Sequence, residues 1–391
     1  MVDYHLFGDV LAFDATYRSN KYKKPLVVFS ASNHHRQTAI FGFALLEDEE
    51  VRTYRWVLLN ILDVMDNKKP AVVVTNGDKA IRAAIADVLP LARHRLCGWH
   101  LEKNCVLRVK EPEFRKVFKK AVYVNFDVAE FEEYWRTTVK SLGLMNNSWF
   151  KGTYDLRESW ATAYLQRTFC AGYRTTSRCE GINAFLKGFL TSTNSLLELV
   201  HSLDRVVKDY RNNEVTAQFY SLYYMPVLTT GLDKIELFAS KIYTSVVFKE
   251  VRKQIKGVGS LLFLGKDSIS TTSIYKFSSM GNRRMIRKVL YDPTEPKIEC
   301  DCMMWNSEGI PCCHIFCMMK YEGLEEIPPG LILRRWCIDA KEWTASSTEG
   351  TAGHDSRLLR YGTLCSAMTV VAKLASDDAA NCEGCNSFFG T

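Results

Sequence analysis

The residues best suited to chemistry form a cysteine-rich run between positions 300 and 317, CDCMMWNSEGIPCCHIFC. Cys300 and Cys302 are separated by one residue, and Cys312 and His314 repeat that spacing after nine intervening residues. Two cysteines spaced this way on a strand share one face, because side chains alternate. Three thiolates and an imidazole suit Zn²⁺ with no open coordination position, which is typical of a structural site.

The alternative is that these four are ordinary buried residues in a chain with 13 cysteines. Cys313 and Cys317 are spare ligands if the register slips. Cys312 fits better than either, because its spacing to His314 mirrors that of the first pair.

Two further groups give weaker metal signals. Cys97 and His100 form an isolated C-x-x-H at a predicted strand-to-helix junction, which favours packing and capping over metal binding. Cys382 and Cys385 form a lone C-x-x-C in a polar tail, and we assign them no function.

Carboxylates and an amide stand at predicted element ends. Asp14 follows an apolar run, at or near the end of the first predicted strand, and Glu180 opens a predicted helix in TTSRCEGINAFLK. Asn76 is the first polar residue after the strand in VVVTNGDKAI, residues 72–81. Carboxylates so placed could hold two divalent ions for phosphodiester chemistry. The alternative is that they are solvated surface acids, which are common in a chain of this size.

The elements that must position these residues begin with alternating strands and helices. Apolar, β-branched and aromatic runs bounded by turn residues predict five strands before residue 100. They cover Val10–Phe13, Leu26–Ala31, Ala39–Leu46, Ala71–Thr75 and Ala92–Cys97. Helical spacing predicts Thr53–Met65 and Lys79–Val88 between them. Three hairpin-like strands followed by β-α-β units indicate an α/β fold with a mixed sheet covered by helices.

The remainder of the chain changes character twice. Residues 100–255 are mostly helical, and residues 256–295 return to short β-like runs. The predicted helices are Phe114–Tyr123, Val128–Ser141, Glu158–Leu165, Glu180–Leu190 and Ser195–Leu222. A helix is predicted near Arg360–Leu374, followed by a frayed polar end. No internal repeat is found.

Composition limits the class of protein. With 47% hydrophobic and 24% charged residues, the 391-residue chain reads as an ordinary folded protein of two or three domains. The N-terminus lacks a signal-peptide pattern, and no apolar run approaches the roughly 20 residues of a membrane helix. We therefore expect no membrane partner and a reducing compartment, the cytosol or the nucleus. The net charge of +7 is compatible with nucleic acid without establishing it.

Four motifs in order give a resemblance that covers nearly the whole chain. FDATYRSNKYKKPLVVF, HRLCGWHLEKN, TTSRCEGINAFLK and the C-x-C…C-x-H cluster resemble the far-red impaired response and far-red elongated hypocotyl family. Members of this plant family are transcription regulators descended from Mutator-like transposases. The resemblance implies a nuclear protein acting in light-responsive or developmental gene control, with DNA and other family members, as homo- or heterodimers, as partners.

The resemblance also implies a domain layout. A ribonuclease-H-like transposase core with a large helical insertion from about residue 100 is expected over 1–255. A SWIM-type zinc finger region is expected over 256–325, and a C-terminal helix with a flexible tail over 326–391. By motif position, Asp14 matches the first acid of the transposase triad and Glu180 the third. Cys300, Cys302, Cys312 and His314 match the SWIM ligands for Zn²⁺.

Two departures from the family pattern stand out. We expect this member to lack the N-terminal DNA-reading domain, so that its DNA contact is weak or indirect. Where the family places an aspartate directly after the fourth strand, this sequence has Asn76, which offers a metal one carbonyl oxygen and no charge. Asp78 could cap the following helix or partly replace the missing carboxylate, and we favour the cap. The site is interpreted as a remnant without catalytic activity.

Three functions are consistent with these observations. The first is a transcription regulator that keeps the transposase fold as a scaffold, and the second is an active transposase with a two-metal carboxylate site. The third is a truncated competitor of full-length family members. Four basic residues are candidate phosphate contacts, although a solvated turn is the better explanation of them: Arg18, Lys21, Lys23 and Lys24.

Overall fold

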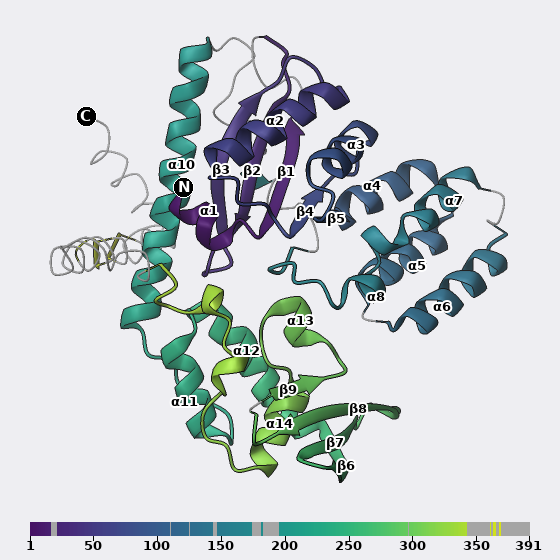
Figure 1. Ribbon diagram of the computed structural model, residues 1–391, viewed down its shortest axis with the longest axis vertical. Coiled ribbons are helices and arrows are strands. Elements are labelled where there is room, and N and C mark those ends of the chain that lie inside the picture. Colours follow the sequence, from purple (N-terminus) through teal and green to yellow (C-terminus); the bar gives the residue numbers. More distant parts are fainter. Residues whose placement is uncertain are drawn as a thin grey trace, which may run out of the picture.

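The computed structural model describes residues 1–16, 22–109, 111–124, 126–143, 147–173, 181–182, 195–295 and 297–341, together with 360, 363–364 and 367–368. Figure 1 shows the N-terminal sheet, a separate group of helices beside it, and a second, smaller sheet in the C-terminal part.

The N-terminal sheet has five strands in the order β3-β2-β1-β4-β5. Strand β1 pairs antiparallel with β2 and parallel with β4, and β5 pairs parallel with β4. The elements of this region are α1 (Val2–Phe7), β1 (Val10–Thr16), β2 (Leu26–Ser32), β3 (Thr38–Leu45), α2 (Val51–Val64), β4 (Val72–Thr75), α3 (Lys79–Val88) and β5 (Arg93–Leu96). The mixed α/β sheet expected from the sequence is confirmed. Its first strand is longer than predicted, so that Asp14 lies within β1.

Helices cover both faces of this sheet (Figure 1). All seven residues of β2 are buried because alternate side chains enter different cores. Val27 and Phe29 pack in a cluster with Leu58 of α2. On the other face, Leu26 and Val28 pack with α10 (Leu196–Tyr223).

A group of short helices follows the fifth strand, as the sequence predicted. These are α4 (Gly98–Arg108), α5 (Pro112–Tyr123), α6 (Val128–Ser141), α7 (Ser148–Asp155), the 3₁₀ turn η1 (Arg157–Ser159) and α8 (Thr162–Leu165). The helix predicted over 158–165 is thus two short pieces. Aromatic rings fill their common core, among them Phe118, Trp135 and Trp160. The helices predicted at Glu180–Leu190 and Arg360–Leu374 lie almost entirely outside the described residues.

The C-terminal part combines helices with a four-stranded antiparallel sheet in the order β6-β7-β8-β9. Its elements are α11 (Asp233–Ile242), α12 (Ser245–Gly257), η2 (Val258–Ser260), β6 (Leu261–Ile269), β7 (Thr272–Ser279), β8 (Asn282–Asp292), β9 (Lys297–Cys300), α13 (Met304–Glu308), α14 (Cys313–Tyr321), η3 (Pro329–Leu331) and η4 (Arg334–Trp336). Strands β6 to β8 have 8 to 11 residues each and are longer than the short runs predicted.

A buried polar network fastens the C-terminal segment to the N-terminal sheet. His34 and His35, which follow β2, both place Nε2 on Gln218 Oε1 of α10, at 3.1 and 2.9 Å. Gln218 in turn donates to Ile338 O. Arg335 donates to Ser32 O at 2.6 Å and pairs with Asp9. The face of the sheet bearing Ala12 and Val74 packs in one core with the buried side chains of Phe316 and Trp336.

Candidate metal centre and carboxylate site

The cysteine and histidine side chains singled out in the sequence are brought together between β9 and α14. Cys300 is the last residue of β9, Cys312 is the residue before α14, and His314 is in the first turn of that helix. The sequence placed both members of the first pair on one strand, which is wrong. Strand β9 ends at Cys300, and a turn with Met303 at φ 54° carries Cys302 toward the others.

The spacing of the four ligand atoms fits a metal ion. They all lie within 4.8 Å of one another, and Cys300 Sγ is 3.7 Å from His314 Nδ1. Bonds of about 2.3 Å to sulfur and 2.0–2.1 Å to nitrogen place tetrahedral ligand atoms roughly 3.5–3.8 Å apart. Cys300, Cys302, Cys312 and His314 could therefore hold a metal ion, with all four positions supplied by the protein.

The electrostatics of the cluster are compatible with a bound cation. Hydrogen bonds from Cys300 and Cys312 lower the pKa of Cys302, so that this sulfur takes the negative charge. The pKa of Cys300 is raised, first by its hydrogen bond to Cys302, and burial raises that of Cys312. Three thiolates in one buried place repel one another, and a divalent ion would offset that repulsion.

The two spare cysteines are not part of this group. Cys313 begins α14, and its backbone N–H donates to Gln254 Oε1. Burial raises the pKa of both Cys313 and Cys317 to about 11, so both are thiols near neutral pH. Among the described residues, the grouping with metal-binding distances contains Cys312 instead.

The C-x-x-H at the start of α4 has the geometry of a helix cap. Cys97 precedes the helix, and its sulfur accepts a hydrogen bond from the His100 backbone N–H at 3.5 Å. This contact agrees with the capping interpretation. Cys382 and Cys385 lie outside the described residues.

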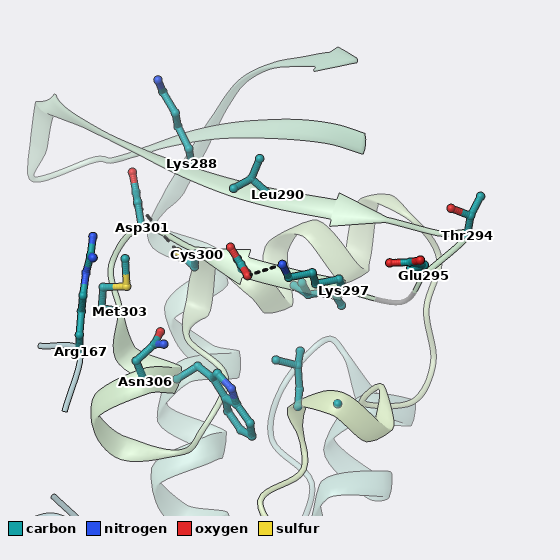
Figure 2. A pocket seen from close by; sticks show the side chains of 15 residues that line it. Arg167, Lys288, Leu290, Thr294, Glu295, Lys297, Cys300, Asp301, Met303 and Asn306 are labelled. Atoms are coloured by element: carbon teal, nitrogen blue, oxygen red, sulfur yellow. Dashed lines mark hydrogen bonds and ion pairs between the residues drawn. The ribbon is translucent and has the colours of Figure 1, made fainter. Parts of the chain in front are cut away.

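A broad hollow of about 1010 Å³ lies along β8, β9 and the turn that follows (Figure 2). Arg167 and Lys288 face it, and Lys297 pairs there with Glu299 at 3.1 Å. Its lining includes three basic side chains and three acidic ones: Arg167, Lys288, Lys297, Glu295, Glu299 and Asp301. This balance of charge favours neither an anionic nor a cationic ligand.

The carboxylate site joins the ends of two neighbouring parallel strands. Asp14 on β1 is buried, and its Oδ1 accepts from the Asn76 side-chain NH₂ at 3.2 Å and from the Ala15 backbone N–H at 3.0 Å. The expected neighbourhood of Asp14 and Asn76 is confirmed. Glu180 lies outside the described residues.

Both ends of the Asn76 amide are engaged. Its Oδ1 accepts from the Asp78 backbone N–H at 3.0 Å, while its NH₂ group donates to Asp14. The orientation follows from chemistry, because a backbone N–H can only donate and a carboxylate only accept. The one oxygen that Asn76 could offer a metal is thus already part of the strand-to-helix turn.

Asp78 caps the helix that follows. It is the N-cap residue of α3, and its Oδ1 accepts from the Ala80 backbone N–H at 2.7 Å. Gly77 lies between the two polar residues at φ 82°, and a Cβ there would come within 2.9 Å of Leu96. The expected cap is confirmed, and the tight NGD turn explains why Asp78 points toward the helix.

The structure also adds a residue that sequence reasoning missed. Arg95 on β5 is 6% exposed and faces a cavity shared with Cys302 and His314. The available signal was a charged residue at an inward position of a short strand. Of the basic residues proposed near the core, Lys24 donates to Glu47 O, and Arg18 and Lys21 lie outside the described residues.

The sheet and its strand-end site lie in a segment that matches a known domain family. Residues 10–104 match the family model of the MULE transposase domain. The chain is 30% identical over 375 residues to Protein FAR1-RELATED SEQUENCE 5 of Arabidopsis thaliana, covering 93% of this chain and 47% of that protein. It is 28% identical over 377 residues to Protein FAR-RED IMPAIRED RESPONSE 1 of the same plant, covering 95% and 45%. The chain belongs to this FAR1 family.

The chain spans about half the length of these relatives. Within the described part of the chain, no helix is both long enough and apolar enough to cross a bilayer.

Proposed function

We propose that this chain is a nuclear transcription regulator that keeps a ribonuclease-H-like transposase fold as a scaffold and does not cut DNA. The observation that carries the proposal is the Asn76 amide, which lies between Asp14 Oδ1 and the Asp78 backbone N–H. The position next to Asp14 is filled by a hydrogen-bond donor where metal-dependent chemistry needs a second anionic ligand.

The chemistry of strand transfer depends on charge at this position. A pair of divalent ions activates the attacking oxygen and stabilises the leaving one, and carboxylates hold both ions. A neutral amide supplies no charge to attract them. To coordinate an ion, Asn76 would also have to give up its hydrogen bond to the Asp78 backbone N–H.

The proposed cofactor is one Zn²⁺ in a SWIM-type finger. Cys300, Cys302, Cys312 and His314 would hold it, and bound zinc would supply a fixed link between β9 and α14. With four protein ligands no position is open for water or substrate, so the role is structural.

The proposed partners are DNA and other family members, as homo- or heterodimers. The net charge of +7 supports an electrostatic, weakly specific contact with DNA. The name of the relative FAR-RED IMPAIRED RESPONSE 1 supports a role in light-responsive gene control, which we extend to this chain as part of the proposal.

Strand-cleavage and binding assays test this function against an active transposase. Zinc-loaded protein is incubated with end-labelled terminal-repeat DNA and Mg²⁺ or Mn²⁺, and binding is followed across a salt series. We expect binding that weakens with salt and no cleaved or joined product. Metal-dependent product that disappears in Asp14→Ala would instead establish the transposase. A fluorescent fusion that stays outside the nucleus would contradict the proposed location.

A further inference from the structure

Arg95 is a buried cation with no ion-pair partner among the described residues. Its side chain is 6% exposed, no hydrogen bond or ion pair joins it to another described residue, and its Nε has no hydrogen-bond partner. A buried charge left unpaired is costly, so a guanidinium in this position indicates a ligand that the protein is built to receive.

The cavity that Arg95 faces has room for such a ligand. Its volume is about 240 Å³, whereas a single water needs only about 10–15 Å³ by the same kind of measure. The cavity is lined by β5, the segment around α8, the turn after β9 and the start of α14. Its polar lining residues include Thr162, Gln166, Gln254, Ser307 and Glu308.

Further donors converge on the same space. Cys312, Cys313 and His314 line the cavity at the start of the nine-residue helix α14. A helix N-terminus carries partial positive charge and favours an anion. Gln254 accepts from the Cys313 N–H through Oε1, which leaves its NH₂ group as a donor.

Glu308, the acidic residue in the lining, forms its ion pair with a residue other than Arg95. Glu308 Oε2 lies 3.7 Å from the guanidinium of Arg36. This pair neutralises the carboxylate locally, so Arg95 remains the cation available to a ligand in the cavity.

The register of the sheet places Arg95 beside the carboxylate site. Val74 pairs with both Ala12 and Arg95, so these three side chains share one face of the sheet. Asp14 and Asn76 each lie two residues further along, on that same face.

We propose that Arg95, the Gln254 amide and the N-terminus of α14 bind a tetrahedral oxyanion of the phosphate class. A guanidinium presents paired donors that match phosphate oxygens, which a point charge does not. The ligand is either free phosphate or the phosphate monoester at the end of a nucleic-acid strand. This site does not depend on whether the chain cuts DNA. A competing explanation is that Arg95 only balances the charge of the neighbouring metal–thiolate centre.

Calorimetric titration of the zinc-loaded full chain tests the proposal. The probes are inorganic phosphate, a 5′-phosphorylated trinucleotide and the same trinucleotide with a 5′-hydroxyl. Arg95→Gln removes both the paired guanidinium donors and the positive charge, whereas Arg95→Lys keeps only the charge. Arg93→Gln is the matched control, because it removes one exposed positive charge from the same strand.

We expect Arg95→Gln to weaken phosphate binding at least tenfold, Arg95→Lys to fall between it and the unmodified chain, and Arg93→Gln to stay within twofold. Zinc content and the far-ultraviolet spectrum should be unchanged in all three. Tighter binding of the phosphorylated trinucleotide than of phosphate identifies a nucleic-acid end, and equal or weaker binding identifies free phosphate.

Three results would overturn the proposal. One is no binding of any phosphate probe by the unmodified chain at millimolar concentration. Another is phosphate affinity that Arg95→Gln leaves unchanged. The third is zinc lost from Arg95→Gln without any phosphate binding in the unmodified chain, which would assign Arg95 to the metal centre alone.

Discussion

The Asn76 side chain donates a hydrogen bond to Asp14 Oδ1 across 3.2 Å and thereby joins the ends of β4 and β1. In a metal-dependent site, cations between carboxylates would make this connection. Here an amide N–H provides the positive end, and the Asn76 carbonyl holds the turn into α3. The strand-end geometry is kept while the charge that would recruit divalent ions is reduced.

Asn76→Asp should turn this contact into a carboxylate pair. Two like charges at about 3 Å raise the pKa of one of them, so the folded state should lose about 1–3 kcal/mol at neutral pH. It should regain this as the pH falls through that raised pKa toward about 4, the pKa of aspartate in the unfolded chain. Millimolar Mn²⁺ should also restore the loss. Melting temperatures with and without Mn²⁺ measure the effect. Asn76→Ala, which removes the hydrogen bond without adding charge, should respond little to Mn²⁺, and an equal response in both variants would contradict this account.

Cys302→Ser should abolish zinc binding, whereas Cys313→Ser should retain it. Loss of one of four ligands removes a large share of the metal-binding free energy and with it the link between β9 and α14. Metal analysis should give about one zinc per chain for the unmodified protein and for Cys313→Ser. Hydrogen exchange should become faster over β9 and α14 in Cys302→Ser only. Zinc retained in Cys302→Ser would refute the ligand set.

The buried histidines make stability depend on pH. Burial lowers the pKa of His34 to about 2 and of His35 to about 4, with nearby Lys341 adding to both effects. Glu214 Oε1 is 3.8 Å from His34 Nδ1 and also pairs with Lys341. Because the unfolded chain takes up protons below about pH 6.5, stability should fall from there toward pH 4, by about 2 kcal/mol per histidine at pH 5.

Urea unfolding of His35→Gln at pH 7 and pH 5 measures this dependence. The drop in unfolding free energy between the two pH values should be smaller than in the unmodified chain by about 2 kcal/mol. His201→Gln on the exposed surface of α10 is the control and should keep the full drop. An unchanged drop in His35→Gln would show that this imidazole does take up a proton in the folded state.

What the sequence could predict followed from local pattern. Apolar and β-branched runs bounded by turn residues predicted the five strands. The parallel pairing of β1 with β4 then places Asp14 beside Asn76. Strand β6 was underestimated because most of its side chains are exposed, so it carries no apolar alternation. The turn that brings in Cys302 depends on a left-handed Met303, which no propensity favours.

Contacts between distant segments left no such signal. His35 and Gln218 are 183 positions apart, and neither residue type marks a buried joint between elements. Arg95 was missed for a related reason. A lone arginine in a short strand is usually solvated. Arg95 is buried by tertiary packing, next to a cavity that α14 and the segment around α8 also line.

Two substitutions at Asp78 distinguish a helix cap from a displaced catalytic carboxylate. Asp78→Ala removes the acceptor for the Ala80 N–H and should destabilise the protein by about 1 kcal/mol. Asp78→Asn keeps that acceptor without the charge, and because asparagine caps about as well as aspartate, it should be nearly neutral. Chemical unfolding measures both variants. Suppose that the unmodified chain shows metal-dependent strand cleavage and that Asp78→Asn folds normally but loses it. The catalytic carboxylate is then at Asp78 instead of position 76, and the chain is an enzyme. If neither protein cleaves DNA, Asp78 acts only as the N-cap of α3. Among the described residues, Asp14 is then the one carboxylate left at the strand end.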